Sequence, residues 1–596
     1  MIKCIAYNII SPLGEGTAEN YEAVKSGRSA LRRYEQRWGL PDPFTASLFT
    51  DEQTAALAVE GLTRFESLAY RSALKTVEEA GIDVANERTV FILSTTKANI
   101  ELLTDDEDNE AAFPSVAAER IARRLGVTTM PITACNACIS GVAALVLALR
   151  LLDTQQYDYA IVCGADVQNK FTVSGFQSLK AISEEACRPF DMERLGLNLG
   201  EAAATMVVAR QEVVQTERHT WTIERGTIRN DAFHISSPSK NGEGAFLALQ
   251  SVLGDNGQRS MVRSASPLGS SKNGQCDSSE LAFINAHGTA TLFNDQMESV
   301  AIERAGLKDI PVNGLKGVFG HTLGAAGILE TIISMAALDD GTILGTRGFH
   351  EKGVSGNIQL SDENSATQKT AFIKMISGFG GGNGAVLVSK HAGQWSMVNG
   401  QWPTGSFSRV LTKKTHRVHL TDASLVIDGC IVDVPETGLQ MLTRIYKNYI
   451  RDYPRFYKMD GLCRLGLIAT EILLGQENRE RFTACDDRAV ILMNHSSSVG
   501  ADLKFLKSIA EEGNYFPSPS VFVYTLPNIV TGEIAMRNNY HGETAFYITD
   551  RRDDNLMQQI INASFADPKT KSIIGGWIDY QDDNHFDADI FITTYY

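Results

Sequence analysis

The first 390 residues alternate short apolar runs with segments in which apolar residues recur at helical spacing. Val90–Ser94 and Tyr159–Cys163 are apolar runs rich in residues that favour strands. Leu62–Ala80 and Ala117–Leu125 carry apolar residues three and four positions apart, which favours amphipathic helices. Alternating strands and helices predict a layered α/β domain.

This pattern weakens in two places. Residues 254–280 are rich in Gly, Ser and Asn, which predicts a surface loop. Residues 392–417 contain Gly400, Pro403 and Gly405 before a basic cluster, and we interpret them as a linker. A chain of 596 residues is too long for one ordinary domain. We therefore predict a main domain over 1–391, a linker over 392–417 and a smaller α/β domain over 418–596.

The last third of the chain resembles the first third in a degenerate form. Three segments recur in the same order and at similar spacing: 64–81 as 458–475, 90–94 as 489–493, and 159–164 as 571–576. Repetition of this kind predicts a second copy of one structural unit. In that copy, the counterpart of the run Thr133–Ala143 falls near 549–554, where the chain carries Asp and Arg, and no cysteine follows Cys485.

Composition narrows the class of protein. Charged residues make up 21% of the chain and the net charge is −16, which indicates a well-hydrated surface and argues against nucleic-acid binding. Nine cysteines without zinc-ligand spacing indicate reduced thiols and predict a cytoplasmic protein. The start of the chain lacks the apolar core of a signal peptide. The most apolar run, Ile139–Leu152, contains Arg150 and is too short for a transmembrane segment.

Cys138 stands where a strand-like segment changes into that apolar run, which has helical character. A thiol at a helix start lies near the positive end of the helix dipole, and we expect a lowered pKa and a reactive thiolate. A buried structural cysteine is the alternative, because free cysteines are among the most buried residues. This run alone leaves the two interpretations about equally supported.

Three later motifs bear on that choice. His287 follows an apolar run and is flanked by Gly288 and Thr289, which suits proton donation at a strand end. His321 lies among glycines, and Lys316 and Glu330 bracket it as a potential ion pair. The glycine-rich run 377–384 lacks the Lys-Ser/Thr ending of a phosphate loop, so we expect a turn whose backbone N–H faces an oxyanion.

Together these motifs resemble the β-ketoacyl-acyl-carrier-protein synthases, condensing enzymes of the thiolase superfamily. The resemblance covers residues 1 to about 390 and includes Arg188–Asp191 and Gly200–Ala202, similar to an RPFD…GEG pattern. It implies a thiolase-like αβαβα fold. The region 418–596 resembles a shortened amino-terminal half-domain of the same superfamily, which implies a half-thiolase unit packed on the main domain or on another half-unit.

The resemblance also implies roles for single residues. Cys138 would accept the acyl group, and the N–H groups of Cys138 and Phe379 would form the oxyanion hole. Phe379 would gate the acyl pocket, and His287 and His321 would assist decarboxylation and stabilise the enolate. The supporting residues would be Lys316 with Glu330, and the acidic pair Asp295 and Glu298.

The expected activity is decarboxylative condensation of an acyl thioester with malonyl-carrier-protein in fatty acid or polyketide biosynthesis. The run 137–141 is similar to synthases of specialised pathways such as aryl polyene pigments. Two alternatives remain, a non-condensing partner that resembles a chain-length factor, and a thiolase or chain-initiating synthase. Cys138 argues against the first, and the paired histidines argue against the second.

The resemblance further implies partners and cofactors. No metal or redox cofactor is expected, because phosphopantetheine arrives on the acyl carrier protein. A homodimer, or a heterodimer with a related synthase, is expected. Docking of the acidic carrier is predicted on basic residues of two helical segments, for which ordinary solvated faces are the alternative: Arg64, Arg71, Arg120, Arg123 and Arg124.

Overall fold

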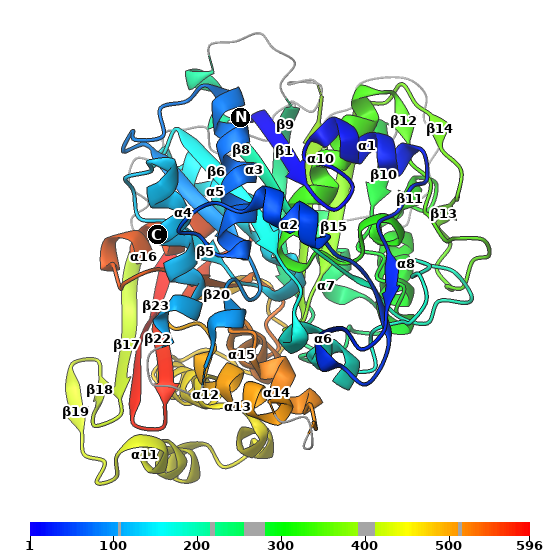
Figure 1. Cartoon of the computed structure of the whole chain (residues 1–596). Coiled ribbons are helices and arrows are strands. Elements are labelled where there is room, and N and C mark those ends of the chain that lie inside the picture. Colours follow the sequence, from blue (N-terminus) through cyan, green and yellow to red (C-terminus); the bar gives the residue numbers. More distant parts are fainter. Residues whose placement is uncertain (105–108, 215–220, 255–279, 391–411, 511–514, 596) are drawn as a thin grey trace.

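The computed structural model describes residues 1–104, 109–214, 221–254, 280–390, 412–510 and 515–595 (Figure 1). The predicted loop over 254–280 therefore lies almost entirely outside the described residues. The predicted linker lies outside them as far as residue 411, and its last six residues belong to strand β17 (Thr412–Thr421). That end of the linker prediction is wrong, because β17 is paired along its length with β23 (His585–Tyr595) and its basic side chains lie largely on exposed positions.

Three units with the same strand order make up the molecule. In the first unit the order is β5-β4-β6-β8-β1, and the second and third units repeat it with parallel pairing at one end and antiparallel pairing at the other. The strands of the first unit are β1 (Ile2–Ile10), β4 (Thr89–Ser94), β5 (Ile132–Ala134), β6 (Tyr159–Asp166) and β8 (Ala202–Arg210).

The second unit has the order β11-β10-β15-β16-β9, and the third has the order β21-β20-β22-β23-β17. The strands of the second unit are β9 (Trp221–Asn230), β10 (Leu281–Asn285), β11 (Pro311–Asn313), β15 (Ala371–Ser377) and β16 (Gly382–Ser389). The further strands of the third unit are β20 (Arg488–Asn494), β21 (Thr544–Ile548) and β22 (Ser572–Asp582). The three segments that recur in the sequence occupy matching elements, so the structure confirms the repeat.

Helices form three layers around the first two sheets. The apolar helices α5 (Ser140–Asp153) and α10 (Ala326–Asp339) are buried against each other between the sheets. Outer helices pack on the first unit and on the second: α3 (Arg64–Ala80), α4 (Pro114–Leu125), α7 (Glu243–Leu253) and α8 (Leu292–Arg304). This arrangement confirms the predicted αβαβα layers. The predicted helices over 62–80 and 117–125 are confirmed as α3 and α4, and Thr63 and Glu66 form a capping box at the start of α3.

The third unit packs on the first, as Figure 1 shows in yellow to red beneath blue and cyan. β21 pairs antiparallel with the edge of β5, with Tyr547 opposite Ala134 and Ile548 opposite Thr133. Helices α12 (Gly461–Leu474) and α15 (Ile529–Asn538) cover one face of its sheet, while α16 (Asp554–Ala563) packs against α5. The prediction that the C-terminal region packs on the main domain is therefore confirmed.

The remaining described helices of at least six residues are α1 (Thr17–Lys25), α2 (Asp51–Leu57), α6 (Lys170–Ser178), α11 (Gly438–Ile445), α13 (Val499–Ile509) and α14 (Pro519–Tyr524). Short strands complete the sheets: β2 (Arg32–Tyr34), β3 (Phe44–Ser47), β7 (Leu199–Gly200), β12 (Thr342–Ile343), β13 (Gln359–Leu360), β14 (Ser365–Ala366), β18 (Leu425–Ile427) and β19 (Cys430–Val432). Among the described residues, no helix is both long enough and apolar enough to span a lipid bilayer.

Candidate active site

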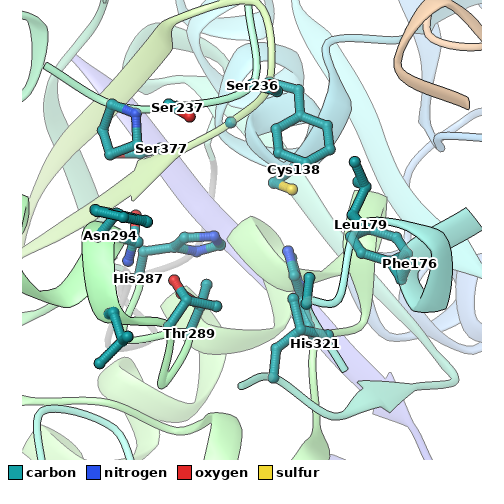
Figure 2. A pocket seen from close by; sticks show the side chains of 18 of the residues that line it. Cys138, Phe176, Leu179, Ser236, Ser237, His287, Thr289, Asn294, His321 and Ser377 are labelled. Atoms are coloured by element: carbon teal, nitrogen blue, oxygen red, sulfur yellow. The ribbon is translucent and has the colours of Figure 1, made fainter. Parts of the chain in front are cut away.

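One cavity of about 390 Å³ collects the residues that the sequence singled out. Cys138, His287, His321 and Phe379 all line it, although they come from four separate segments of the first two units. Figure 2 shows the side chains of Cys138, His287 and His321 directed toward one another. The Cys138 sulfur and one nitrogen of each imidazole lie within 4.8 Å of one another.

A tight turn places Cys138 between β5 and α5. Ala137 adopts a left-handed φ of 50°, which is costly for a residue with a Cβ and sharpens the turn before the thiol. Cys138 lies in the 3₁₀ turn Ala137–Ile139, two residues before α5 begins at Ser140, and is 9% exposed. The position at a helix start is as predicted.

The expected thiolate is not what this environment favours. Burial raises the pKa of the Cys138 thiol to about 12, although Lys316 and the backbone N–H groups of Cys138 and Phe379 act in the opposite direction. Desolvation therefore outweighs the helix start, and the resting group is a thiol. The two N–H groups predicted for the oxyanion hole are thus both close enough to the sulfur to lower the pKa of the thiol.

His287 and His321 form a closely packed pair. Their ring centroids are 4.8 Å apart with planes at 79°. The backbone N–H of Leu323 donates to His321 Nδ1 at 3.2 Å, so the neutral ring carries its proton on Nε2. His321 Nε2 and His287 Nδ1 are buried polar atoms without a hydrogen-bond partner among the described residues. The site thus holds unsatisfied imidazole nitrogens.

Burial sets the charge of both imidazoles. Desolvation lowers the pKa of His287 and His321 well below the ordinary value, and the positive charge of Lys316 adds to the shift in each case. Both rings are therefore neutral near pH 7, and each can donate one N–H without carrying a net charge.

A buried cluster of charges lies behind the histidines. Glu330 accepts hydrogen bonds from Lys316 Nζ and from Lys374 Nζ, and both lysines are fully buried. Lys374 also donates to the carbonyl of Ala286 at 3.1 Å, and burial lowers its pKa to about 8. The predicted Lys316–Glu330 pair is present. Lys374 was missed, although a lysine within the apolar strand β15 was a signal for it.

This cluster also decides which ligands the site favours. Cys and His are ligand types that zinc binds. However, two lysines and one glutamate leave a net positive charge beside the histidines, which opposes a metal cation and favours a developing oxyanion. The arrangement therefore suits chemistry in which negative charge forms on a carbonyl oxygen.

Comparison with known proteins identifies the architecture. The family model for the β-ketoacyl synthase N-terminal domain matches residues 2–213, and the model for the C-terminal domain matches residues 269–350. The chain carries both domains of the β-ketoacyl synthase family within residues 2–350. It is thus a condensing enzyme of the acyltransferase class, as the resemblance implies.

Relatives of this β-ketoacyl synthase cover different parts of the chain. The 3-oxoacyl-acyl-carrier-protein synthase 2 of Coxiella burnetii is 24% identical over 420 residues, which cover 64% of this chain and 96% of the relative. A solved ketosynthase/chain length factor titled for ishigamide covers 65% of this chain and 99% of its own, with a TM-score of 0.55 and 22% identity. A solved structure titled "PfaC Keto synthase-Chain length factor" covers all of this chain and 78% of its own, with a TM-score of 0.74 and 14% identity.

Acidic residues of this β-ketoacyl synthase hold the segments that carry the histidines. The Glu298 carboxylate accepts from the backbone N–H groups of His287 at 2.7 Å and Gly288 at 2.8 Å. Asp295 accepts from the backbone N–H of Phe190 at 2.7 Å and so ties the Arg188–Asp191 segment to α8. Burial raises the pKa of Glu298 to about 7 and that of Asp295 to about 6. Both lie where a supporting role requires.

Asp166 is a further acidic residue of this kind that the sequence analysis missed. It ends β6, is 1% exposed, and accepts from the backbone N–H of Gly324 at 2.7 Å and from Thr95 Oγ1 at 2.7 Å. These bonds fix the loop after His321 to the end of β4. Its signal in the sequence was an acidic residue that closes an apolar strand.

The five arginines predicted to dock a carrier lie on α3 and α4, and none of them lines the cavity. Arg64 pairs with the buried Glu201 at 2.7 Å, and Arg71 donates to the carbonyl of Leu57 at 2.8 Å. Arg120 pairs with the buried Glu66 at 3.2 Å. Arg123 and Arg124 are exposed, and Arg123 pairs with Glu119 of the same helix at 2.9 Å.

Proposed function

We propose that this protein is a 3-oxoacyl-acyl-carrier-protein synthase that performs decarboxylative Claisen condensation. The observation that carries the proposal is a buried thiol beside two neutral imidazoles in one cavity, with a buried cationic cluster behind them. That combination offers a nucleophile together with uncharged hydrogen-bond donors for an oxyanion.

The first half-reaction is acyl transfer. The Cys138 sulfur attacks the thioester carbonyl of an acyl-carrier protein, the new C–S bond forms, and the carrier thiol leaves with the proton that Cys138 gives up. The N–H groups of Cys138 and Phe379 stabilise the tetrahedral oxyanion. Because the resting thiol is protonated, the attack needs a base, and His287 is the imidazole within 4.8 Å that can serve, since the neutral His321 ring already carries its proton on Nε2.

The second half-reaction makes the carbon–carbon bond. The C–C bond to the malonyl carboxylate breaks, CO2 leaves, and the electron pair forms an enolate. The enolate oxygen accepts hydrogen bonds from the N–H groups of His287 and His321. The enolate carbon attacks the thioester on Cys138, and Cys138 leaves and takes up one proton. Neutral donors suit this step, because they stabilise the enolate without protonating its carbon.

The proposal includes partners and pathway. The substrates arrive on the phosphopantetheine arm of an acyl carrier protein, and the reaction as written needs no metal or redox cofactor. Fatty acid or polyketide biosynthesis is the proposed context, with an aryl polyene pathway as its narrowest form, and the cytoplasm is the proposed location. Any homodimer or heterodimer must form away from the edge of β5, because β21 occupies that edge.

A non-condensing role like that of a chain-length factor is the second candidate. Cys138 in the first unit argues against that role for the main domain. The third unit suits it better, because residues 549–553 between β21 and α16 carry no thiol at the position of the Cys138 turn.

Mass spectrometry of the intact chain tests the proposal. After incubation with an acyl-carrier protein, we expect an acyl adduct on Cys138 that is absent in Cys138→Ala. The Cys138→Ala variant should still decarboxylate malonyl-carrier-protein, because both histidines remain. Decarboxylation by the wild type without any adduct on Cys138 would favour the non-condensing candidate.

A further inference from the structure

The third unit reaches the glycine-rich loop beside Cys138. Asn528, the residue that precedes α15, donates from Nδ2 to the carbonyl oxygen of Phe379 at 2.9 Å and is 5% exposed. One turn later, Gly532 lies so close to Gly380 that a Cβ at this position would come within 2.5 Å of the Gly380 carbonyl oxygen. The C-terminal region therefore touches the catalytic loop directly.

Both peptide groups that flank Phe379 are held. The N–H of Phe379 lies close enough to the Cys138 sulfur to lower the pKa of the thiol, and the carbonyl of Phe379 accepts from Asn528. The N–H of Gly380 donates to the carbonyl oxygen of Ile235 at 2.7 Å. The carbonyl of Gly380 accepts from Asn230 Nδ2 at 2.8 Å. The carbonyl and the N–H of Phe379 belong to two rigid peptide planes joined at its Cα, so a hydrogen bond to the carbonyl limits rotation about ψ and with it how far the plane that carries the N–H can turn.

The repeat provides an internal comparison. At the position that corresponds to Asn528, the first unit carries Phe113, which precedes α4 and packs against His495 at 5.2 Å. The loop that contains Phe379 belongs to the second unit and lies between β15 and β16. Of the two corresponding residues, Asn528 contacts this loop and Phe113 contacts His495 instead. The chain thus has an amide side chain, that of Asn528, at the one of these two positions that lies next to the Phe379 carbonyl.

We propose that Asn528 is a positioning residue, which holds the Phe379 carbonyl so that the Phe379 N–H stays directed at the acyl oxygen on Cys138. The C-terminal unit then contributes to acyl transfer without chemistry of its own. This inference rests on the proposed function, because the oxyanion arises only if Cys138 attacks a thioester.

Two reactions at the same sulfur separate positioning from general structure. Attack on an acyl-pantetheine thioester develops an oxyanion, whereas alkylation by iodoacetamide displaces iodide and develops none. In Asn528→Ala we expect Cys138 acylation to slow about 10-fold, less than the roughly 100- to 1000-fold typical of losing a whole oxyanion donor. Alkylation, with its rate divided by the thiolate fraction of each variant, should stay within about twofold of the wild-type value, because displacement of iodide develops no oxyanion for the Phe379 N–H to stabilise.

Two further variants complete the experiment on the full chain. Asn528→Asp keeps the shape of the side chain, replaces the donor with an acceptor and adds a carboxylate beside the Phe379 carbonyl, so it should slow acylation at least as much as Asn528→Ala and keeps the test valid if Asn528→Ala folds poorly. Asn538→Ala is the matched control, because Asn538 ends the same helix and donates to Ile534 at 3.0 Å, away from the loop. It should leave both rates unchanged.

Three results would overturn the inference. Wild-type acylation rates in both Asn528 variants would show that the hydrogen bond has no positioning role. Parallel losses of acylation and alkylation would indicate a general structural effect. A wild-type chain that is alkylated but never acylated would instead refute the proposed function, and the inference would fall with it.

Discussion

At the scale of single residues, the site depends on groups whose charge burial controls. Cys138 remains a thiol and both histidines remain neutral, while Lys316, Lys374 and Glu330 supply a positive potential beside them. Protonated imidazoles in this position would lie close to two buried ammonium groups, which costs free energy. The neutral state of the pair is therefore a consequence of the cluster as well as of burial.

Lowering the pH from 8 to 5.5 tests this charge state directly. A pKa lowered below its ordinary value means that the neutral ring persists at a pH where a free imidazole, with a pKa of about 6.5, is already half protonated. We expect the ¹⁵N imidazole signals of His287 and His321 to stay those of neutral rings across this range, with assignment from His→Ala variants.

His585 is the control for this titration within the chain. It is exposed and bonds Asp582 at 2.8 Å, which raises its pKa, so its signal should titrate above 6.5. A midpoint near 6.5 for either His287 or His321 would contradict the electrostatic account of the site.

The residues of the site differ in how far the sequence alone reveals them. Cys138, His287, His321 and Phe379 stand in local motifs, so their order and spacing were sufficient to bring them together. Lys374 and Asn528 act through contacts across 44 and 149 positions, which no local motif records. The predicted thiolate was wrong because helix position is visible in the sequence, whereas the depth of burial is not.

At the scale of elements, a close contact between a glycine and an aromatic ring joins the first unit to the third. Gly175 in α6 lies directly under the ring of Phe522 in α14, where a Cβ would overlap the ring. That ring is itself held by Phe176 at 5.4 Å and Phe505 at 5.2 Å, so it has little freedom to move away.

Replacing this glycine should reverse the usual effect of such a change. Gly→Ala within a helix normally stabilises by about 1 kcal/mol. Because of the clash, we expect Gly175→Ala to lower the free energy of unfolding by about 1–3 kcal/mol, measured by urea denaturation. In a Phe522→Ala background the same substitution should become stabilising, and a stabilising effect with Phe522 present would refute the proposed contact.

Elements with local signals were predictable, and those defined by distant partners were not. The helices over 62–80 and 117–125 show their spacing and caps in the sequence. The first six residues of β17 were predicted to be linker because their alternation is weak and the partner strand β23 lies more than 160 residues away in sequence. Hydrogen bonds to that distant strand, and not local preference, make Thr412–Thr421 a strand.

At the scale of the whole molecule, one and a half copies of a two-unit fold form a continuous structure. The apolar helix α10 is buried between two sheets, whereas its counterpart α16 exposes Asp554, Asn555 and Gln559. On the open face of the third sheet, Arg417 pairs with Asp589 at 2.6 Å. Arg552 pairs with the same carboxylate. These polar groups make the face soluble in water, so the third unit needs no fourth unit to cover it among the described residues.

The interface between the first two units and the third, unlike the open face, is covered. It buries charged side chains whose ion-pair partners lie on the other side of the interface. Arg150 pairs with Glu543, and Arg229 pairs with Asp567 at 2.6 Å, with all four side chains buried. Removing one partner of such a pair typically costs about 3–5 kcal/mol. Separation would also expose the edge of β5, which is a site for aggregation.

Expression of Met1–Lys390 alone tests whether the third unit is required. We expect this fragment to be largely insoluble and to lack Cys138 acylation, because Arg150, Arg229 and the β5 edge lose their partners and Phe379 loses Asn528. Co-expression with residues 412–596 as a separate chain should restore a soluble complex of the two fragments, detected by size-exclusion chromatography, and with it the acyl adduct. If the fragment alone were as soluble and as active as the full chain, the third unit would have no role in stability or in the site. The buried pairs predict instead that the two parts fold only together.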